Sequence, residues 1–388
     1  MAGLYVHIPF CKSRCIYCDF YSTTREAEQE AYVDALCQEI RTRRHELTAP
    51  AEGLVRVHTI YIGGGTPSLL STQQLARIFQ TIHENYAVEE DAEVTVEMNP
   101  EDSVNLAQQR EINRISLGIQ TFDNGLLRFL RRRHSAERAV EAVRSLQAAG
   151  IHNISIDLIY GLPGQTLQQW EHDLDVAFSL GVQHLSAYAL SYESGTPLWQ
   201  LRQQGRVEEV SDEVSVEMYR RLCERARQAG FEHYEISNFA LPGFHSRHNS
   251  SYWTGEPYLG FGPGAHSFDG VRTRRANAPD LRKYIEDSPP ALPVREGAVC
   301  PEGHAHGSFE ILSDSELYDE MVMCGLRTRR GINLHRLLDR FGQQRYDYLL
   351  RCARPHLTAQ RLAITDGHLH LTESALMVSD DVMSDLMA

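Results

Sequence analysis

The sequence lacks long apolar runs, and little precedes its first apolar stretch. No run of about 18 apolar residues occurs among its 388 residues, whereas a membrane-spanning helix needs roughly 20. Met1 is followed almost at once by the apolar residues 4–10, which leaves no room for a signal peptide. We therefore expect a cytoplasmic protein without a membrane-spanning helix.

Positive charge is scarce as well. The chain carries 38 Lys and Arg residues against 52 Asp and Glu residues, a formal net charge of −14. Proteins that bind nucleic acid present positive charge to the phosphate backbone, so this balance argues against a general nucleic-acid binder. Hydrophobic residues make up 42% of the chain, which supports a sizeable core and excludes global disorder. The length suits two domains, or one barrel with an appended piece.

Cysteine is infrequent but clustered. Cys11, Cys15 and Cys18 follow the first apolar stretch with the spacing C-x3-C-x2-C, and the next cysteine is Cys37. This usage does not resemble a secreted disulfide framework. Thiolates this close together are typical of zinc, copper or iron–sulfur sites. Structural zinc would need a fourth ligand from elsewhere in the chain, whereas a four-iron cluster on three cysteines leaves one iron with an open position. The spacing favours the cluster, with a structural zinc protein as the alternative.

Strands and helices are expected to alternate through the first half of the chain. Strand patterns cover residues 4–10, 57–62, 93–98, 115–119, 154–160 and 184–190, and helical patterns cover residues 26–47, 71–86, 135–149 and 167–180. Such alternation predicts a parallel α/β sheet. The G-x-G-x-x-G motif of an open Rossmann sheet does not follow the first strand. We therefore favour a barrel, whose active site lies at the carboxyl ends of its strands.

The pattern changes after residue 207. An amphipathic helix is expected at 211–229 and a strand at 232–236, followed by a loop-like segment at 242–279 and a Pro/Gly-rich connector at 289–306. Three helices and two short strands then resemble a winged-helix module, but so acidic a chain shows no basic recognition helix. We predict a barrel over residues 1–240, a loop-rich connecting segment over 241–310 and a helical, winged-helix-like α+β domain over 311–388.

Three stretches of the sequence carry residues that suit a ligand. The glycines of GGGTP, residues 63–67, allow the backbone to approach a charged ligand, although a tight turn explains them equally well. Asp157 places a charge inside an apolar strand, where a carboxylate needs a partner. The segment His248-Asn249-Ser250-Ser251-Tyr252-Trp253 suits a planar porphyrin, because imidazole can bind iron and aromatic rings can stack on the macrocycle. The alternative is a loop packed on the barrel by its aromatic residues.

The cysteine spacing at the end of a first strand, with Tyr17 before the third cysteine, resembles the radical S-adenosylmethionine (SAM) superfamily. The sequences around the cysteines, Y-V-H-I-P-F-C and Y-C-D-F, are similar to those of the oxygen-independent coproporphyrinogen III oxidase branch of that superfamily. The resemblance implies a partial (β/α)6 TIM-like barrel, open on one side. It also implies a 4Fe–4S cluster on Cys11, Cys15 and Cys18, with SAM bound to the unique iron.

The resemblance also assigns residues to the SAM site. The GGGTP motif matches the segment that meets the amino group of SAM, and Glu97 matches a contact to its ammonium or ribose. Arg132 has Arg131 and Arg133 beside it, and a solvated charge at a helix end is the alternative for it. The SAM contacts that the resemblance implies are Tyr5, Tyr17, Gly63, Gly64, Gly65, Thr66, Glu97, Gln120, Arg132, Asp157, Ser191 and His266.

Two functions, haem chaperone and coproporphyrinogen III oxidase, are compatible with this cluster. Phe20 stands where the oxidases of the branch carry a further cysteine, the cluster motif begins as early as residue 11, and H-N-x-x-Y-W marks a haem-chaperone group. We therefore expect a chaperone that binds haem through His248, Asn249, Tyr252 and Trp253 and passes it to a haem-accepting protein.

The resemblance further suggests a homodimer and peripheral contact with a membrane haem protein. The alternative is the radical SAM oxidase that decarboxylates coproporphyrinogen III, and a radical SAM methylase is a third reading. Cys300, His304 and His306 are either a local metal site or part of a linker.

Overall fold

The computed structural model describes residues 1–47, 53–102, 109–286 and 307–388. Six parallel strands form the centre of its main sheet, in the order in which they occur along the chain. They are β1 (Ala2–Ile8), β2 (Arg56–Gly64), β3 (Ala87–Met98), β4 (Arg114–Gln120), β5 (Ile154–Tyr160) and β6 (His184–Ala189). Each lies where a strand pattern was predicted. The prediction of an α/β fold with six strand–helix units is therefore confirmed.

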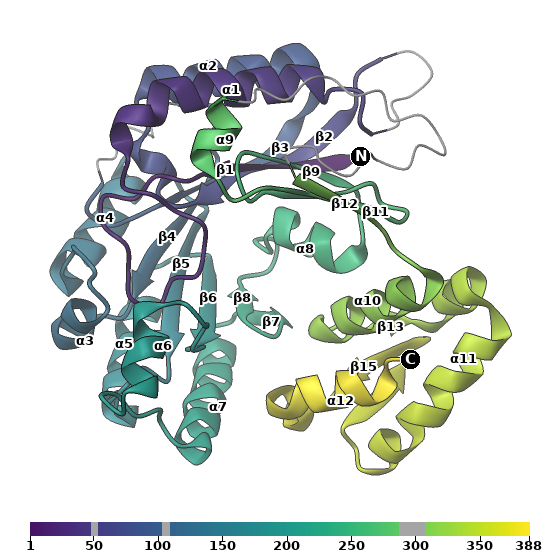
Figure 1. The fold of residues 1–388 in the computed structure, drawn as a ribbon. Coiled ribbons are helices and arrows are strands. Elements are labelled where there is room, and N and C mark those ends of the chain that lie inside the picture. Colours follow the sequence, from purple (N-terminus) through teal and green to yellow (C-terminus); the bar gives the residue numbers. More distant parts are fainter. Residues whose placement is uncertain (48–52, 103–108, 287–306) are drawn as a thin grey trace.

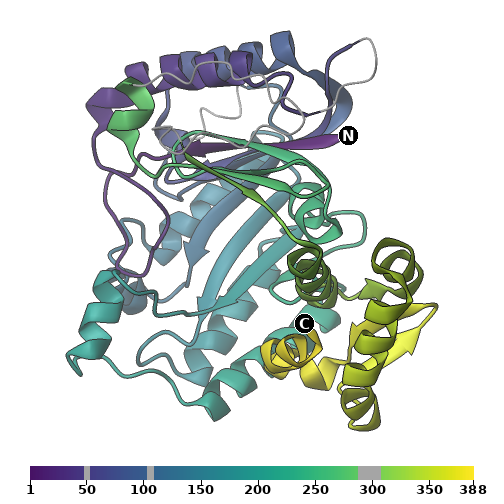
Figure 2. The ribbon, with the colours of Figure 1, turned by 45° about the vertical axis from the view of Figure 1, so that its right-hand side comes forward.

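Helices cover the outer face of this curved sheet (Figures 1 and 2). They are α1 (Gln29–Thr42), α2 (Thr72–Asn85), the short α3 (Asn124–Phe129), α4 (Ala136–Ala148) and α5 (Leu167–Ser179). Capping boxes start α2 and α5, because a Ser or Thr side chain accepts from the third helical residue and the Gln at that position bonds back. The strand residues that face these helices, such as Leu4, Val6 and Ile8, are fully buried. Burying this apolar layer holds the units together.

The sheet does not close into a complete barrel. Beyond β6 it continues with β8 (Asn238–Ala240), which is antiparallel to β6, and β7 (Glu232–Glu235), which is antiparallel to β8. Between β6 and these strands the chain forms α6 (Pro197–Gln203) and α7 (Asp212–Gln228). Beyond β1 it continues with β9 (Tyr258–Phe261), which is parallel to β1, and then with antiparallel β10 (His266–Phe268), β11 (Thr273–Asn277) and β12 (Gly307–Ile311). In the described residues β12 and β7 are the two free edges, so the barrel is partial, as predicted.

The segment 242–279 is not the loop that its Gly, Pro and Asn content predicted. It contains the helix α8 (Arg247–Thr254), the strands β9, β10 and β11, and it leads into α9 (Leu281–Glu286). These strands have only three to five residues, too few to show an alternating pattern. They exist because β1 offers a free edge to β9. Cys300, His304 and His306 lie outside the described residues.

A buried carboxylate fixes this sheet extension to α1. Glu39 is 1% exposed and accepts hydrogen bonds from Arg43 Nη1 at 2.7 Å and from the Gly262 N–H at 2.9 Å. The same carboxylate accepts from Asn277 Nδ2 at 2.8 Å and from the Tyr284 hydroxyl at 2.6 Å. One helix residue therefore binds the β9–β10 loop, β11 and α9 together.

The C-terminal part has its own core and a three-stranded sheet, in the order β13–β15–β14. Its elements are α10 (Asp314–Arg327), β13 (Ile332–Asn333), α11 (Leu334–Thr358), β14 (Leu362–Thr365), β15 (His368–Leu371) and α12 (Ser379–Leu386). Helix α11 combines two of the three helices expected in this domain, across a kink where Gly342 adopts φ +75°. The part meets the barrel where Glu235 pairs with Thr328. None of the described helices combines the length and apolar character that crossing a membrane requires.

Candidate cluster and cofactor site

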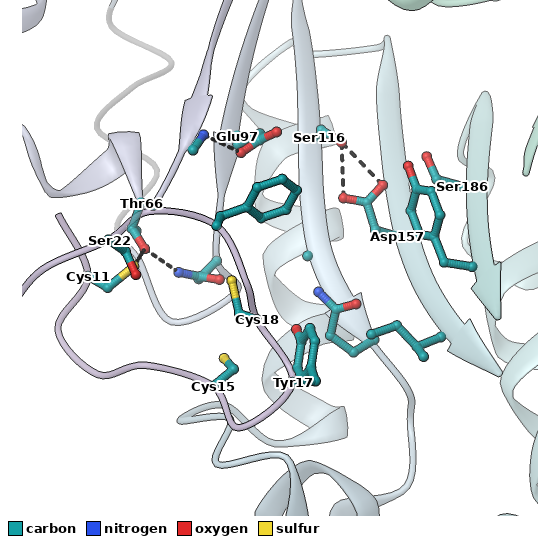
Figure 3. A pocket seen from close by; sticks show the side chains of 18 of the residues that line it. Cys11, Cys15, Tyr17, Cys18, Ser22, Thr66, Glu97, Ser116, Asp157 and Ser186 are labelled. Carbon is teal, nitrogen blue, oxygen red and sulfur yellow. Dashed lines mark hydrogen bonds between the residues drawn. The ribbon is translucent and has the colours of Figure 1, made fainter. Parts of the chain in front are cut away.

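The three cysteines of the predicted cluster lie on the loop that follows β1, at the carboxyl ends of the parallel strands. All three line one cavity of about 450 Å³ (Figure 3). Burial raises the pKa of the Cys11 thiol, and it raises the pKa of the Cys18 thiol to about 11. In the described part of the chain, no three His, Cys, Asp or Glu side chains are close enough to bind a single metal ion. Three thiols at the end of an open cavity fit a 4Fe–4S cluster whose fourth iron takes a ligand from that cavity.

A chain of hydrogen bonds connects two of these cysteines. Arg132 Nη1 lies 3.5 Å from Cys15 Sγ, and Thr66 Oγ1 lies 3.6 Å from Cys11 Sγ. Asn99 joins the two, because its amide donates to Thr66 Oγ1 at 3.0 Å and its oxygen accepts from Arg132 Nη2 at 2.6 Å. Hydrogen bonds to cluster sulfurs tune their charge, so this network is placed to stabilise thiolates.

Only one of the three consecutive arginines points into the site. Arg132 is partly buried and also donates to the Gly118 carbonyl at 2.6 Å, whereas Arg131 and Arg133 are exposed. Arg131 adopts φ +59°, a left-handed conformation that turns the chain between its neighbours. Arg131 and Arg133 are therefore solvated charges at a helix end, whereas Arg132 is not.

The glycine-rich segment after β2 packs against the cysteine loop. The Gly65 N–H donates to the Ile8 carbonyl at 2.7 Å, and a Cβ at Gly65 would lie 2.6 Å from the Phe10 carbonyl oxygen. Gly64 adopts φ +105°, and its N–H donates to Glu97 Oε2 at 3.0 Å. The segment therefore needs glycine for close backbone contact, and Gly64, Gly65 and Thr66 line the cavity.

Two carboxyl groups share the opposite wall of the cavity (Figure 3). Burial raises the pKa of Glu97 to about 7; the hydrogen bond from Tyr61 at 2.7 Å lowers that pKa and nearby Asp157 raises it. Burial also raises the pKa of Asp157, which accepts from Ser116 Oγ at 3.2 Å. Two buried carboxyl groups in one cavity favour a cationic ligand, because its positive charge relieves their repulsion.

Gln120 ends β4 in a strained conformation. Its φ is +73°, and the register of β4 with β5 shifts between Gly118 and Gln120. A non-glycine residue in this region costs about 1–3 kcal/mol and is found mainly at functional sites. Gln120 lines the cavity together with the predicted residues Tyr17, Asp157 and Ser191.

Several cavity residues were not predicted. Ser186 is the strand partner of Asp157, Ser116 is its hydrogen-bond donor, and Asn99 and Arg114 complete the wall. A signal for the two serines was present, because both interrupt otherwise apolar strands close to the position of Asp157. Asn99 was visible only as the residue after a strand, where polar residues are common.

Other predicted residues lie elsewhere. Tyr5, His266, Tyr252 and Trp253 line a second cavity, of about 800 Å³, between the barrel and the C-terminal part. Gly63 is among the lining residues of neither cavity, although a Cβ there would meet the Glu97 carboxyl group at 2.9 Å.

The H-N-x-x-Y-W segment is a helix, α8, with its residues on different sides. Asn249 lines the cysteine cavity, whereas His248 lines neither cavity. His248 is 1% exposed, with Nδ1 2.9 Å from Thr59 Oγ1 and Nε2 2.8 Å from the Tyr252 hydroxyl. Burial lowers the pKa of His248 to about 3, so its imidazole is neutral.

Known proteins resemble the chain over nearly its whole length. Residues 5–177 match the radical SAM superfamily and residues 312–378 match the HemN C-terminal domain. The haem chaperone HemW of Lactococcus lactis is 33% identical, over 99% of this chain and 96% of its own. HemW of Bacillus subtilis is 35% identical, over 88% of each chain.

The solved structure of HemN from Escherichia coli, a coproporphyrinogen III oxidase and radical SAM enzyme, matches with a TM-score of 0.81 at 21% identity. The match covers 100% of this chain and 90% of that one, and it supports the fold alone. The superfamily implies a 4Fe–4S cluster and SAM, in agreement with the three thiols and the two buried carboxyl groups of the first cavity. Similarity to HemW across the barrel and the C-terminal part shows that the chain belongs to the HemW family of radical SAM proteins.

Proposed function

We propose that this protein is a haem chaperone, which binds haem and passes it to an acceptor protein. The observation that carries the proposal is identity of 33–38% with proteins named haem chaperone HemW, over at least 84% of this chain. Phe20 supports it, because the oxidases of the branch have a cysteine at this position. A cytoplasmic location, a homodimer, the acceptor and contact with a membrane haem protein remain predictions.

The residues of the first cavity have distinct roles in this proposal. Cys11, Cys15 and Cys18 hold the cluster, and Arg132 orients the Cys15 sulfur. Glu97 and Asp157 bind the ammonium group of SAM, and the Gly64–Thr66 backbone lies against that group. When bound, the cluster supplies one-electron reduction of SAM. The predicted haem contacts are His248, Asn249, Tyr252 and Trp253.

Haemin titration of the anaerobically purified chain tests the proposal. We expect a saturable change in the Soret band and no turnover of coproporphyrinogen III in the presence of SAM and a reductant. Robust formation of protoporphyrinogen IX would instead favour the oxidase. A Soret band that does not change with added haemin would contradict haem binding.

SAM binding should strengthen as the pH rises through the pKa of Glu97. Since this pKa is about 7, Glu97 is mostly neutral near pH 6 and mostly negative near pH 7.5, and the negative form attracts the ammonium group of SAM. We expect the dissociation constant to fall about five- to tenfold over this range, below the α-amino pKa of about 7.7–8.0. Isothermal titration of the cluster-loaded protein measures it.

The Glu97→Gln variant is the informative comparison. It should bind SAM more weakly and without this pH dependence, whereas Glu84→Gln, which changes an exposed residue of α2, should behave like wild type. A wild-type dissociation constant that stays level from pH 6 to 7.5 would show that Glu97 does not face the ammonium group.

A further inference from the structure

The second cavity lies between the inner face of the partial barrel and the C-terminal part. Its volume of about 800 Å³ lies within the range of about 300–1,000 Å³ that is usual for cofactor sites. The barrel contributes strands β1, β9, β10 and β11, and the C-terminal part contributes α10, β13 and the start of α11. The cavity thus depends on both parts of the fold.

The walls of this cavity suit a flat apolar ring. They carry Tyr252, Trp253, Tyr258, Phe268, Leu317 and Met321. Tyr252 and Tyr258 already contact each other edge to face, with ring centroids 4.6 Å apart. Aromatic side chains can stack on a macrocycle, and the thioether of Met can pack against it.

The charge at the edge of the cavity suits carboxylates. Arg274, Arg330, Arg336 and Arg340 line it, with Glu320 as its acidic residue. Arg274 pairs with Glu320 at 2.9 Å. Within the described residues, the other three arginines pair with no carboxylate, and Arg336 and Arg340 donate only to backbone carbonyls. Exposed cations without a carboxylate partner are unexpected here in a chain of net charge −14, and they provide sites for the carboxylates of a ring.

One histidine of this wall is available to a metal. His266 starts β10, is exposed to the cavity, and its ring has no hydrogen-bond partner among the described residues. His7 also lines the cavity, but Nδ1 bonds the Tyr5 hydroxyl at 3.0 Å and Nε2 bonds the Tyr21 carbonyl at 2.9 Å. His368 has contacts through both ring nitrogens as well. Burial, reinforced by Arg274, lowers the pKa of His266 and so favours the neutral imidazole that binds metals.

We propose, on the basis of the haem-chaperone function, that haem binds in this inter-domain cavity with His266 as its iron ligand. Arg330, Arg336 and Arg340 face the propionates, and Tyr252 and Trp253 pack against the ring. His248 is a positioning residue: it does not line the cavity, but its 2.8 Å hydrogen bond orients the Tyr252 hydroxyl. Haem then lies beside the cluster site, because Phe20 lines both cavities.

Two probes separate the iron bond from the rest of the site. Haemin and metal-free protoporphyrin IX share the ring and the propionates, but only haemin can bind to a histidine. The full-length chain is titrated with each probe, and absorbance gives the dissociation constant and the Soret position. Thermal unfolding followed by circular dichroism verifies that every variant is folded.

We expect His266→Ala to move the Soret band and weaken haemin binding about tenfold, with protoporphyrin binding nearly unchanged. Reversing the charge of two arginines, in Arg336→Glu/Arg340→Glu, should weaken the binding of both probes about tenfold. The controls His152→Ala and Arg351→Glu/Arg354→Glu change exposed residues outside the cavity, the second pair on the same helix α11, and should leave both titrations unchanged. His248→Ala should weaken binding while the haemin spectrum keeps its Soret position.

Two results would overturn the assignment while haem binding itself stands. One is a wild-type Soret position in His266→Ala together with a displaced band in His248→Ala, which would make His248 the ligand. The other is unchanged affinity for both probes after the arginine reversal, which would place the ring elsewhere. If the wild-type chain fails to bind haemin, the proposed function fails together with this site.

Discussion

The Cys15→Ala variant, purified without oxygen, should be colourless and nearly free of iron. The wild-type chain should be brown and carry about four iron atoms together with a similar amount of sulfide. Cys15 lies between Cys11 and Cys18 on the loop after β1, and its sulfur has the Arg132 guanidinium 3.5 Å away. Two remaining thiolates cannot hold a cluster that three support, and no other cysteine lines this cavity among the described residues. Iron and sulfide analysis with visible absorption measures the loss.

Cys352→Ala is the matched control, because Cys352 is a free thiol of α11, far from the barrel loop in sequence. It should retain colour and iron. Iron at the wild-type level in Cys15→Ala would contradict the cluster assignment. Zinc in place of iron in the wild-type chain would favour the structural zinc alternative.

The Glu39→Ala variant should lose about 3–5 kcal/mol of unfolding free energy, because several buried donors lose their shared acceptor and each unsatisfied group costs about 1–3 kcal/mol. Arg43 keeps its ion pair with Glu46. Arg43 is 4% exposed and donates to Glu39 Oε1 at 2.7 Å. Loss of the carboxylate also removes the acceptor for Gly262, Asn277 and Tyr284. Urea unfolding followed by circular dichroism measures the change.

The control lies on the same helix. Glu30 pairs with Arg77 at 2.7 Å, but its side chain is 63% exposed, so Glu30→Ala should lower the free energy of unfolding much less than Glu39→Ala does. Equal losses of unfolding free energy in the two variants would show that burial of the Glu39 network does not contribute to stability. Because this network joins β9, β11 and α9 to α1, Glu39→Ala should also weaken haemin binding in the neighbouring cavity.

Local patterns were reliable for the parallel half of the chain. Each βα unit carries an apolar strand and an amphipathic helix, so its periodicity follows from contacts within about 40 residues. The cysteine spacing is also local, since all three thiols belong to one loop. The fold class, the place of the three cysteines at the strand ends and the family could therefore be predicted.

Long-range contacts decided the remainder. The strands β9, β10 and β11 form because β1 provides an edge and Glu39 provides an acceptor, although both lie more than 200 residues earlier. Arg132, alone among three arginines, turns inward because Asn99 and Gly118 accept its hydrogen bonds. His248 and Asn249 are neighbours in sequence, yet a helix directs them to different surroundings.

The sequence by itself determined which chemistry is present: three thiols in one loop, a glycine-rich turn and carboxylates at strand ends. The tertiary structure decided which side chains share a cavity, since that depends on strand order and on the placement of the C-terminal part. A motif places residues only a few positions apart, whereas a cavity of about 800 Å³ is enclosed by elements far apart in the chain. For this reason His266 emerged as a candidate iron ligand only from the folded chain.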